Sequence, residues 1–495
     1  MQPQASTASR LALAVAVVAV LLRLPFLAVQ PSPDEAGLLI VAGQWHAGDS
    51  LYGDYWVDRP PVLMAVFEVA DAAGGVVALR VIGLVAVVAT ILLCAATARR
   101  FAGPRASLWA AIAAGVLTVS PWLGADRVNA ELLAAPWIAA GVYAAVRAVE
   151  GERWSPWALL CGAAVTGAVA TKQNMVDAGV FLVVLLIAMV VSGRMPVRAA
   201  LRHVALAAAG AVVLAVLLLG WAWTRGTPPP DLLDALFAFR VRAAEVMSAW
   251  PSPSAEERRD ELVGRAGLSG LVVLAAVVLL APALRRFRSP ACVALAAMAA
   301  YACVSISLGG SWWNHYLVQL AVPVAVGAGV VAARTRLVVP AILGYAIVSA
   351  VVGAGVVRPA LGTPDAPVAA GRMIADVARP GDTVVHAWGR PDLVRASGLS
   401  SPYEQLWSLP VRTDDPELVL FRQVVEGADA PTWLVTRGTL RAPGLRTEAA
   451  ERVVDRRYRP VAEVCGLRIL LRRDVSRATP DSSPDVECKP STHLR

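Results

Sequence analysis

Apolar runs of about 20 residues recur along the first 357 positions, separated by shorter polar segments. Each run is long enough to cross the hydrocarbon core of a bilayer as an α-helix. The first run follows Arg10 and has no clear small-residue cleavage site behind it, so it is read as a retained helix. The pattern predicts about eleven spans, at residues 11–30, 78–98, 106–122, 131–149, 155–171, 174–192, 202–223, 267–284, 290–308, 317–333 and 337–357.

Arginine is distributed unevenly between the segments that separate these runs. Alternate segments hold Arg99, Arg100, Arg105, Arg147, Arg153, Arg194, Arg198, Arg285, Arg286, Arg288, Arg334 and Arg336. By the positive-inside rule these segments face the cytoplasm. The N-terminus is then expected in the cytoplasm and the C-terminus outside the plasma membrane. The net charge of +8 therefore reflects topology rather than nucleic-acid binding.

Two long segments fall on the expected outer side, at residues 31–77 and 224–266. In the first, residues 35–47 and 61–72 read as helices lying along the membrane surface. In the second, residues 231–247 alternate apolar and charged positions with helical period, which predicts an amphipathic helix.

Composition divides the chain into two parts. The whole is 57% hydrophobic and only 17% charged, but the apolar runs stop near residue 357. The predicted fold is a mainly α, polytopic membrane domain (1–357), an exoplasmic α/β domain (358–475) and a disordered tail (476–495). In the α/β domain the expected strands are 383–388, 432–436, 461–464 and 467–471, and the expected helices are 366–378 and 415–425.

Cysteine spacing does not resemble a zinc site. Cys94, Cys161, Cys292 and Cys303 fall within the predicted spans. Cys465 and Cys488 fall outside, where a disulfide would persist, and the sequence leaves open whether they form one.

Polar residues that are unusual beside apolar runs all fall on the expected outer side. They are Asp34, Glu35, Tyr52, Asp54, Asp58, Arg59, Asp126, Arg127, Asn129, Glu131, Lys172, Gln173, Asn174, Trp312, Trp313, Asn314, His315 and Tyr316. The predicted topology therefore gathers carboxylates, cations and aromatic rings in one plane at the lipid–water boundary.

Each of these residues also has a purely structural interpretation. Asp34 after Pro33 fits a helix cap, and Glu131 fits a favourable charge in a first helical turn. Lys172 fits an anchor that reaches toward the headgroups. Trp312, Trp313 and Tyr316 fit an aromatic belt, and His315 fits a satisfied interfacial histidine.

The combination suits transfer of a group from a lipid phosphate. A carboxylate can accept a proton from an acceptor hydroxyl, and fixed cations can stabilise the charge that develops on a leaving phosphate. An aromatic ring offers a face to a sugar or an isoprenoid, while the membrane holds the lipid tail.

Several short motifs resemble those of the superfamily C (GT-C) glycosyltransferases, specifically bacterial relatives of dolichyl-phosphate-mannose protein mannosyltransferases and aminoarabinose transferases. The matching runs are Asp34-Glu35, Gly48-Asp-Ser-Leu-Tyr52, Asp58-Arg59-Pro-Pro61, Asn129-Ala-Glu131, Thr171-Lys172-Gln173, His315-Tyr316 with Pro323, and Trp388-Gly389-Arg-Pro391. The chain departs from the family in one respect, because relatives often have an aromatic residue shortly after the acidic pair, where this chain has Ala36-Gly37-Leu38.

The resemblance implies a polyprenyl-phosphate sugar as donor and a glycan, lipid or protein as acceptor, with membrane lipids around the enzyme. It implies Asp34 as the base, with Glu35 beside it as an orienting neighbour or acceptor contact. It implies donor phosphate binding by Lys172, Arg59 and His315, and substrate binding by Glu131, Asn129, Asp126, Tyr316 and Tyr52. Some members use a divalent metal, but this sequence has no evident ligand set, so metal dependence stays open and no cofactor is assigned.

A flippase or transporter for lipid-linked sugars is the alternative function. That class favours charges at mid-membrane, broken helices and internal repeats, which the sequence does not display. A catalytically inactive receptor whose outer domain binds glycan is the third hypothesis.

Overall fold

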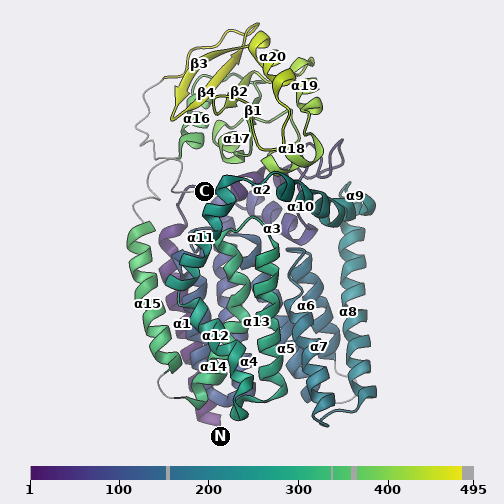
Figure 1. Cartoon of the computed structure of the whole chain (residues 1–495), viewed down its shortest axis with the longest axis vertical. Coiled ribbons are helices and arrows are strands. Elements are labelled where there is room, and N and C mark those ends of the chain that lie inside the picture. The colour runs from purple at the N-terminus through teal and green to yellow at the C-terminus, as the bar shows by residue number, and fades with distance from the viewer. Residues whose placement is uncertain (1, 152–155, 336–337, 358–364, 482–495) are drawn as a thin grey trace.

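The computed structural model describes residues 2–151, 156–335, 338–357 and 365–481. Long helices stand side by side in a bundle, and a smaller α/β unit covers one end of it (Figure 1). The bundle helices are α1 (Gln2–Arg23), α4 (Val76–Val119), α5 (Ala130–Glu150), α6 (Pro156–Val169), α7 (Asp177–Val191), α8 (Val197–Thr224), α11 (Pro253–Leu268), α12 (Leu271–Leu280), α13 (Pro290–Leu308), α14 (Ala321–Arg334) and α15 (Val338–Val357).

The number of membrane spans depends on how bent and short helices are counted. Within the described residues, seven helices are long and apolar enough to cross a membrane, or eight if the bent pair α11 and α12 forms one span. The helix α4 contains two predicted spans on either side of a kink at Ala102 and Gly103, and α6 and α7 are shorter apolar helices. A multi-pass helical membrane protein is therefore confirmed, whereas the predicted count is not.

Short helices lie between the bundle and the α/β unit (Figure 1). They are α2 (Pro33–Gly43), α3 (Pro61–Ala72), α9 (Pro229–Leu233) and α10 (Phe239–Ala249), with a π-helical turn at Asp234–Ala238. The surface helices predicted at 35–47 and 61–72 correspond to α2 and α3, and the amphipathic segment 231–247 spans α9 to α10. We call residues 31–75, which carry α2 and α3, the first loop.

The α/β unit, which we call the C-terminal domain, contains α16 (Ala366–Ala375), α17 (Pro391–Ser397), α18 (Ser408–Asp414), α19 (Val419–Glu426) and α20 (Glu448–Arg457). Its strands β1 (Val384–Ala387), β2 (Trp433–Thr436), β3 (Tyr458–Val464) and β4 (Leu467–Arg472) form a sheet in the order β1-β2-β4-β3. Strand β1 runs parallel to β2, and the other two pairs are antiparallel. The predicted tail falls largely outside the described residues, as does Cys488, so the pairing of Cys465 with Cys488, which the sequence left open, also falls outside them.

The two faces of the sheet pack against different layers. Val384, Val435 and Ile469 belong to the same buried apolar cluster as the membrane helices. Their neighbours Val385 and Leu434 point the other way, into a separate cluster with α19 and α20, as the two-residue period of a strand requires. One apolar core therefore runs from the bundle into the lower face of the sheet and fixes the C-terminal domain on the bundle.

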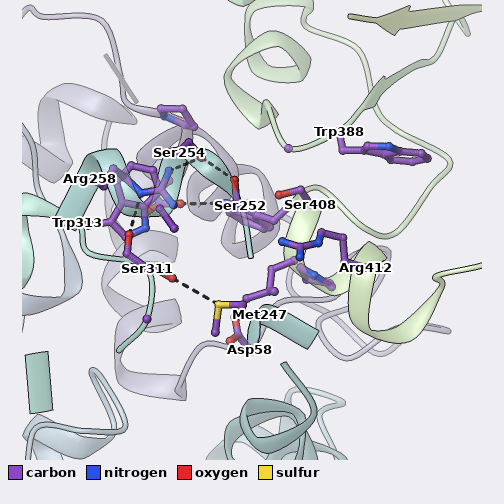
Figure 2. A pocket seen from close by; sticks show the side chains of 18 of the residues that line it. Asp58, Met247, Ser252, Ser254, Arg258, Ser311, Trp313, Trp388, Ser408 and Arg412 are labelled. Carbon is purple, nitrogen blue, oxygen red and sulfur yellow. Dashed lines mark hydrogen bonds between the residues drawn. The ribbon is translucent and has the colours of Figure 1, made fainter. Parts of the chain in front are cut away.

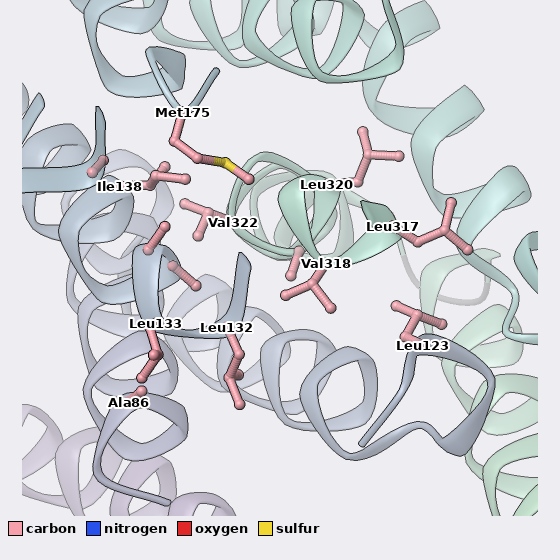
Figure 3. Packing of buried hydrophobic residues seen from close by; sticks show 14 of the residues in the cluster. Ala86, Leu123, Leu132, Leu133, Ile138, Met175, Leu317, Val318, Leu320 and Val322 are labelled. Carbon is pink, nitrogen blue, oxygen red and sulfur yellow. The ribbon is translucent and has the colours of Figure 1, made fainter. Parts of the chain in front are cut away.

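Beneath that junction, buried apolar side chains hold together the segments that carry polar site residues. Leu132 and Leu133 of α5 pack with Leu317 and Val318 of the 3₁₀ helix η6 (Asn314–Leu320) (Figure 3). Burying each such side chain stabilises the fold by roughly 1.5–3 kcal/mol. This packing holds the first turn of α5 against η6.

Candidate functional site

A cavity of about 820 Å³ lies where the first loop, α10, α11 and η6 meet the C-terminal domain. Figure 2 shows side chains from these segments around it, with Arg258 and Trp313 on one side and Arg412 and Trp388 from the C-terminal domain opposite. The acidic lining residues are Asp34, Asp58, Glu131 and Glu256, and the basic ones are Arg59, Arg127, Lys172, Arg240, Arg258, Arg259, Arg390, Arg412, Arg437 and Arg441. This excess of positive charge favours an anionic ligand.

Asp34 lines the cavity from the first turn of α2. It does not cap the helix, because Ser32 is the N-cap residue and Pro33 occupies the first helical position. Its Oδ1 instead accepts a hydrogen bond from the indole Nε1 of Trp407 at 3.0 Å. The interpretation of Asp34 as a helix cap is therefore wrong.

Glu35 is fully buried and does not belong to the cavity lining. Its Oε1 lies 2.7 Å from Arg80 Nε, and its Oε2 accepts a hydrogen bond from Arg80 Nη2 at 2.8 Å. The backbone N–H of Val128 donates to Oε1 at 2.7 Å, and Ser32 donates to Oε2 through both its N–H and its hydroxyl. Glu35 thus ties α2 to α4 and to the segment before α5.

Glu131 and Lys172 form an ion pair on the cavity wall. Glu131 is almost completely buried in the first turn of α5, and Lys172 lies between α6 and α7. The Lys172 Nζ also sits 4.0 Å from the centre of the Tyr316 ring, a cation–π contact. Lys172 is therefore held in place by a carboxylate and an aromatic face rather than extended toward lipid headgroups.

His315 completes this cluster from η6. Its Nε2 lies 3.9 Å from Glu131 Oε1, and its ring is nearly parallel to that of Trp313, with centroids 6.3 Å apart. Its Nδ1 is buried without a hydrogen-bond partner among the described residues. The structure thus brings together the predicted residues Glu131, Lys172, His315 and Tyr316.

Arg59 reaches the cavity from the first loop. Its Nη1 donates to Asp58 Oδ1 at 2.7 Å. Partial burial lowers the pKa of Arg59, but the nearby carboxylates of Asp58, Asp34 and Glu131 outweigh that effect and the pKa is raised. This balance of charges indicates that Arg59, Asp34 and Glu131 share one electrostatic environment.

Three predicted substrate contacts have structural partners. Tyr52 is fully buried, does not line the cavity, and donates its hydroxyl hydrogen to the Arg59 carbonyl. Asp126 also lies away from the cavity lining and pairs with Arg127 at 2.9 Å. Asn129 lines the cavity, but its side chain caps α5 by accepting from Leu132 N–H at 2.9 Å. These contacts suit residues that support the site.

Sequence reasoning missed parts of the cavity that come from distant segments. Arg240 of α10 pairs with Asp58 at 2.7 Å, and Arg258 of α11 lies over the Trp313 ring at 4.6 Å. The whole roof, including Trp407, comes from the C-terminal domain. The sequence interpretation also gave no role to Asp177, which is fully buried at the start of α7 and accepts from Gln319 Nε2 at 2.9 Å.

In the described part of the chain, no group of three or more His, Cys, Asp or Glu side chains is arranged to hold a metal ion. Of the cavity carboxylates, Asp58 and Glu131 are paired with cations. Metal dependence is therefore not assigned.

Comparison with known proteins identifies the fold. The family model for dolichyl-phosphate-mannose-protein mannosyltransferases matches residues 58–223. The crystal structure of ArnT from Cupriavidus metallidurans, bound to undecaprenyl phosphate, superposes with a TM-score of 0.61 over 93% of this chain and 97% of that chain, at 15% identity. The chain has the GT-C fold.

A second GT-C structure agrees with this assignment. The archaeal oligosaccharyltransferase AglB from Archaeoglobus fulgidus, in complex with an inhibitory peptide and a dolichol-phosphate, superposes with a TM-score of 0.54 over 86% of this chain and 69% of that chain, at 14% identity. No curated protein matches the sequence significantly. The matched family region includes Lys172 and Glu131 but neither Asp34 nor His315. The GT-C resemblance inferred from the motifs is confirmed for the fold.

Proposed function

We propose that this GT-C protein transfers a sugar from a polyprenyl-phosphate donor to an acceptor hydroxyl. The observation that carries the proposal is the shared cavity of Asp34, Lys172, Glu131 and His315, whose lining has an excess of positive charge. A site of this kind suits an anionic donor and a reaction that releases a phosphate. ArnT and AglB, which share the fold, are described with undecaprenyl phosphate and dolichol-phosphate respectively.

In the proposed reaction Asp34 is the general base. Its carboxylate takes the proton of the acceptor hydroxyl as the acceptor oxygen bonds to the anomeric carbon of the sugar. The bond between that carbon and the phosphate oxygen breaks, and polyprenyl phosphate leaves with the bonding electrons. A single displacement of this kind inverts the anomeric configuration.

Cations stabilise the departing phosphate in this scheme. Lys172 is held between Glu131 and Tyr316, and Arg59 is held by Asp58. A positive charge that is already in position does not have to be reorganised when negative charge develops. His315 directs its Nε2 toward Glu131 at 3.9 Å. Its Nδ1 has no hydrogen-bond partner among the described residues, and in the proposal the ring would add a hydrogen bond to the phosphate.

Glu35 takes a different role from Asp34 in the proposal. Among the described residues its hydrogen bonds and its ion pair are made to Arg80, Val128 and Ser32, and it does not line the cavity. We assign it to holding the first turn of α2, and therefore Asp34, against the bundle.

The proposed site lies on the exoplasmic side of the plasma membrane. The arginine-rich segments, including Arg99, Arg100 and Arg194, follow helices that lead away from the cavity end of the bundle. Cytoplasmic placement of those segments by the positive-inside rule puts the cavity outside.

Two experiments test the proposal. Glycan and lipid-linked-sugar analysis of a deletion strain should reveal a missing sugar and an accumulating donor. The purified protein, in detergent and with no second compartment, should then transfer that sugar to the acceptor fraction of the deletion strain. Transport across vesicles without transfer in detergent would contradict the proposal and support a flippase.

A further inference from the structure

We propose that Trp407 of the C-terminal domain is a positioning residue for Asp34, an inference that rests on the proposed function. The indole Nε1 of Trp407 donates to Asp34 Oδ1 at 3.0 Å, and both residues line the cavity. They are 373 positions apart in the sequence. The proposed base is therefore oriented by a side chain from outside the membrane domain.

Gly37 provides the room that the Trp407 ring occupies. A Cβ atom placed on Gly37 would lie 2.5 Å from Trp407 Cζ2 and 2.8 Å from Pro391 Cγ, closer than carbon atoms can pack. The C-terminal domain thus places an aromatic ring on α2 from another part of the chain.

The position of Trp407 does not depend on Asp34, because the segment before it is docked on the first loop independently. The Trp56 N–H donates to the Glu404 carbonyl at 3.2 Å, and the Ser401 N–H donates to the Tyr55 hydroxyl at 3.0 Å. The indole is therefore presented to Asp34 by a fixed segment, which is what a positioning residue requires.

The hydrogen bond constrains one of the two carboxylate oxygens. Oδ1 of Asp34 is held by Trp407, and Oδ2 has no hydrogen-bond partner in the part of the chain that the structure describes. Oδ2 is thus the oxygen left to receive the acceptor proton.

Trp407→Phe tests this role, because it keeps a ring in the space over Gly37 but removes the N–H donor. In detergent, with a radiolabelled polyprenyl-phosphate sugar panel that begins with mannose, we expect kcat to fall about 10- to 100-fold, the worth of a hydrogen bond to a charged group. The donor KM should stay within about twofold, because Trp407 acts on the base rather than the phosphate.

Trp122→Phe is the matched control, because Trp122 lies outside the cavity lining and donates its N–H to the Ser349 carbonyl at 3.0 Å. Its kcat and donor KM should stay within about twofold of the wild-type values. Gly37→Ala is the second variant, since its Cβ displaces the indole, and it should lower kcat as Trp407→Phe does.

A Trp407→Phe enzyme with the wild-type kcat would overturn the positioning role. So would an equal fall of kcat in Trp122→Phe. Failure of the proposed function looks different, because the wild-type protein would then transfer no sugar in detergent.

Discussion

Replacing Glu35 with alanine should destabilise the fold rather than remove a catalytic group. The carboxylate is fully buried and meets the equally buried Arg80, two backbone N–H groups and the Ser32 hydroxyl. The Glu35→Ala protein would keep the Arg80 charge in the interior without its ion-pair partner, although the carbonyls of Phe26 and Asp126 would still accept hydrogen bonds from it. A buried charge without its counter-ion is strongly unfavourable.

The expected loss of stability is roughly 3–5 kcal/mol, the range found when one partner of a buried ion pair is removed. At about 1.4 kcal/mol per tenfold change, this alters the unfolding equilibrium by about 100- to 4,000-fold. The double variant Glu35→Gln with Arg80→Met removes both charges and retains most of the volume. It should recover a large part of the loss, because neutral replacements of a buried pair are often tolerated.

The assay is unfolding of the detergent-purified variants by heat and by denaturant, alongside transfer measured on the folded fraction. We expect Glu35→Ala to lower both the unfolding midpoint and the yield in membranes, while its folded fraction keeps measurable turnover. A Glu35→Ala protein as stable as the wild type but without turnover would refute the reasoning and place Glu35 in the chemistry.

Two further variants test other parts of the cavity. Lys172→Met should lower kcat/KM for the donor by about 100-fold or more, as expected for a lost charge-stabilising group. Arg225→Met is the control, because Arg225 lies outside the cavity lining and pairs with Glu68. Its kcat/KM in the same transfer assay should stay near that of the wild type. Burial lowers the pKa of His386 in β1 to about 3. As pH falls below about 6.5, this histidine is therefore protonated in the unfolded state but not in the folded state, and the folded state loses stability until about pH 3. Between about pH 6.5 and pH 5 the loss of stability is roughly 2 kcal/mol. Unfolding midpoints measured at these two pH values should show no such loss in His386→Gln, whereas the control His46→Gln should retain it.

The fold was predictable because hydrophobic length and arginine distribution depend on the bilayer, which acts on every span alike. The two spans predicted at 78–98 and 106–122 correspond to the two halves of α4, which Gly103 and Pro104 interrupt. The predicted count is not confirmed by a length criterion, because α4 is counted once for two predicted spans and α6 and α7 are shorter apolar helices.

The candidate site was only partly predictable. Glu131, Lys172 and His315 could be predicted to lie together, because alternate loops of a multi-spanning protein lie on the same side of the membrane. The role of Trp407 depends on how a separate domain docks, which no local pattern encodes. The role of Glu35 did leave a signal, because Ser32 followed three residues later by Glu35 is a capping box, and Arg80 is a charge at the start of an apolar run.

The rate of sugar transfer by Asp34→Asn tests the central claim most directly. The variant keeps the size of the side chain and its hydrogen-bonding partner Trp407 but cannot accept the acceptor proton at neutral pH. With the purified protein in detergent, a polyprenyl-phosphate sugar and the acceptor, we predict loss of transfer at wild-type membrane yield and unfolding midpoint. Wild-type turnover by Asp34→Asn would contradict the account and remove Asp34 from the mechanism.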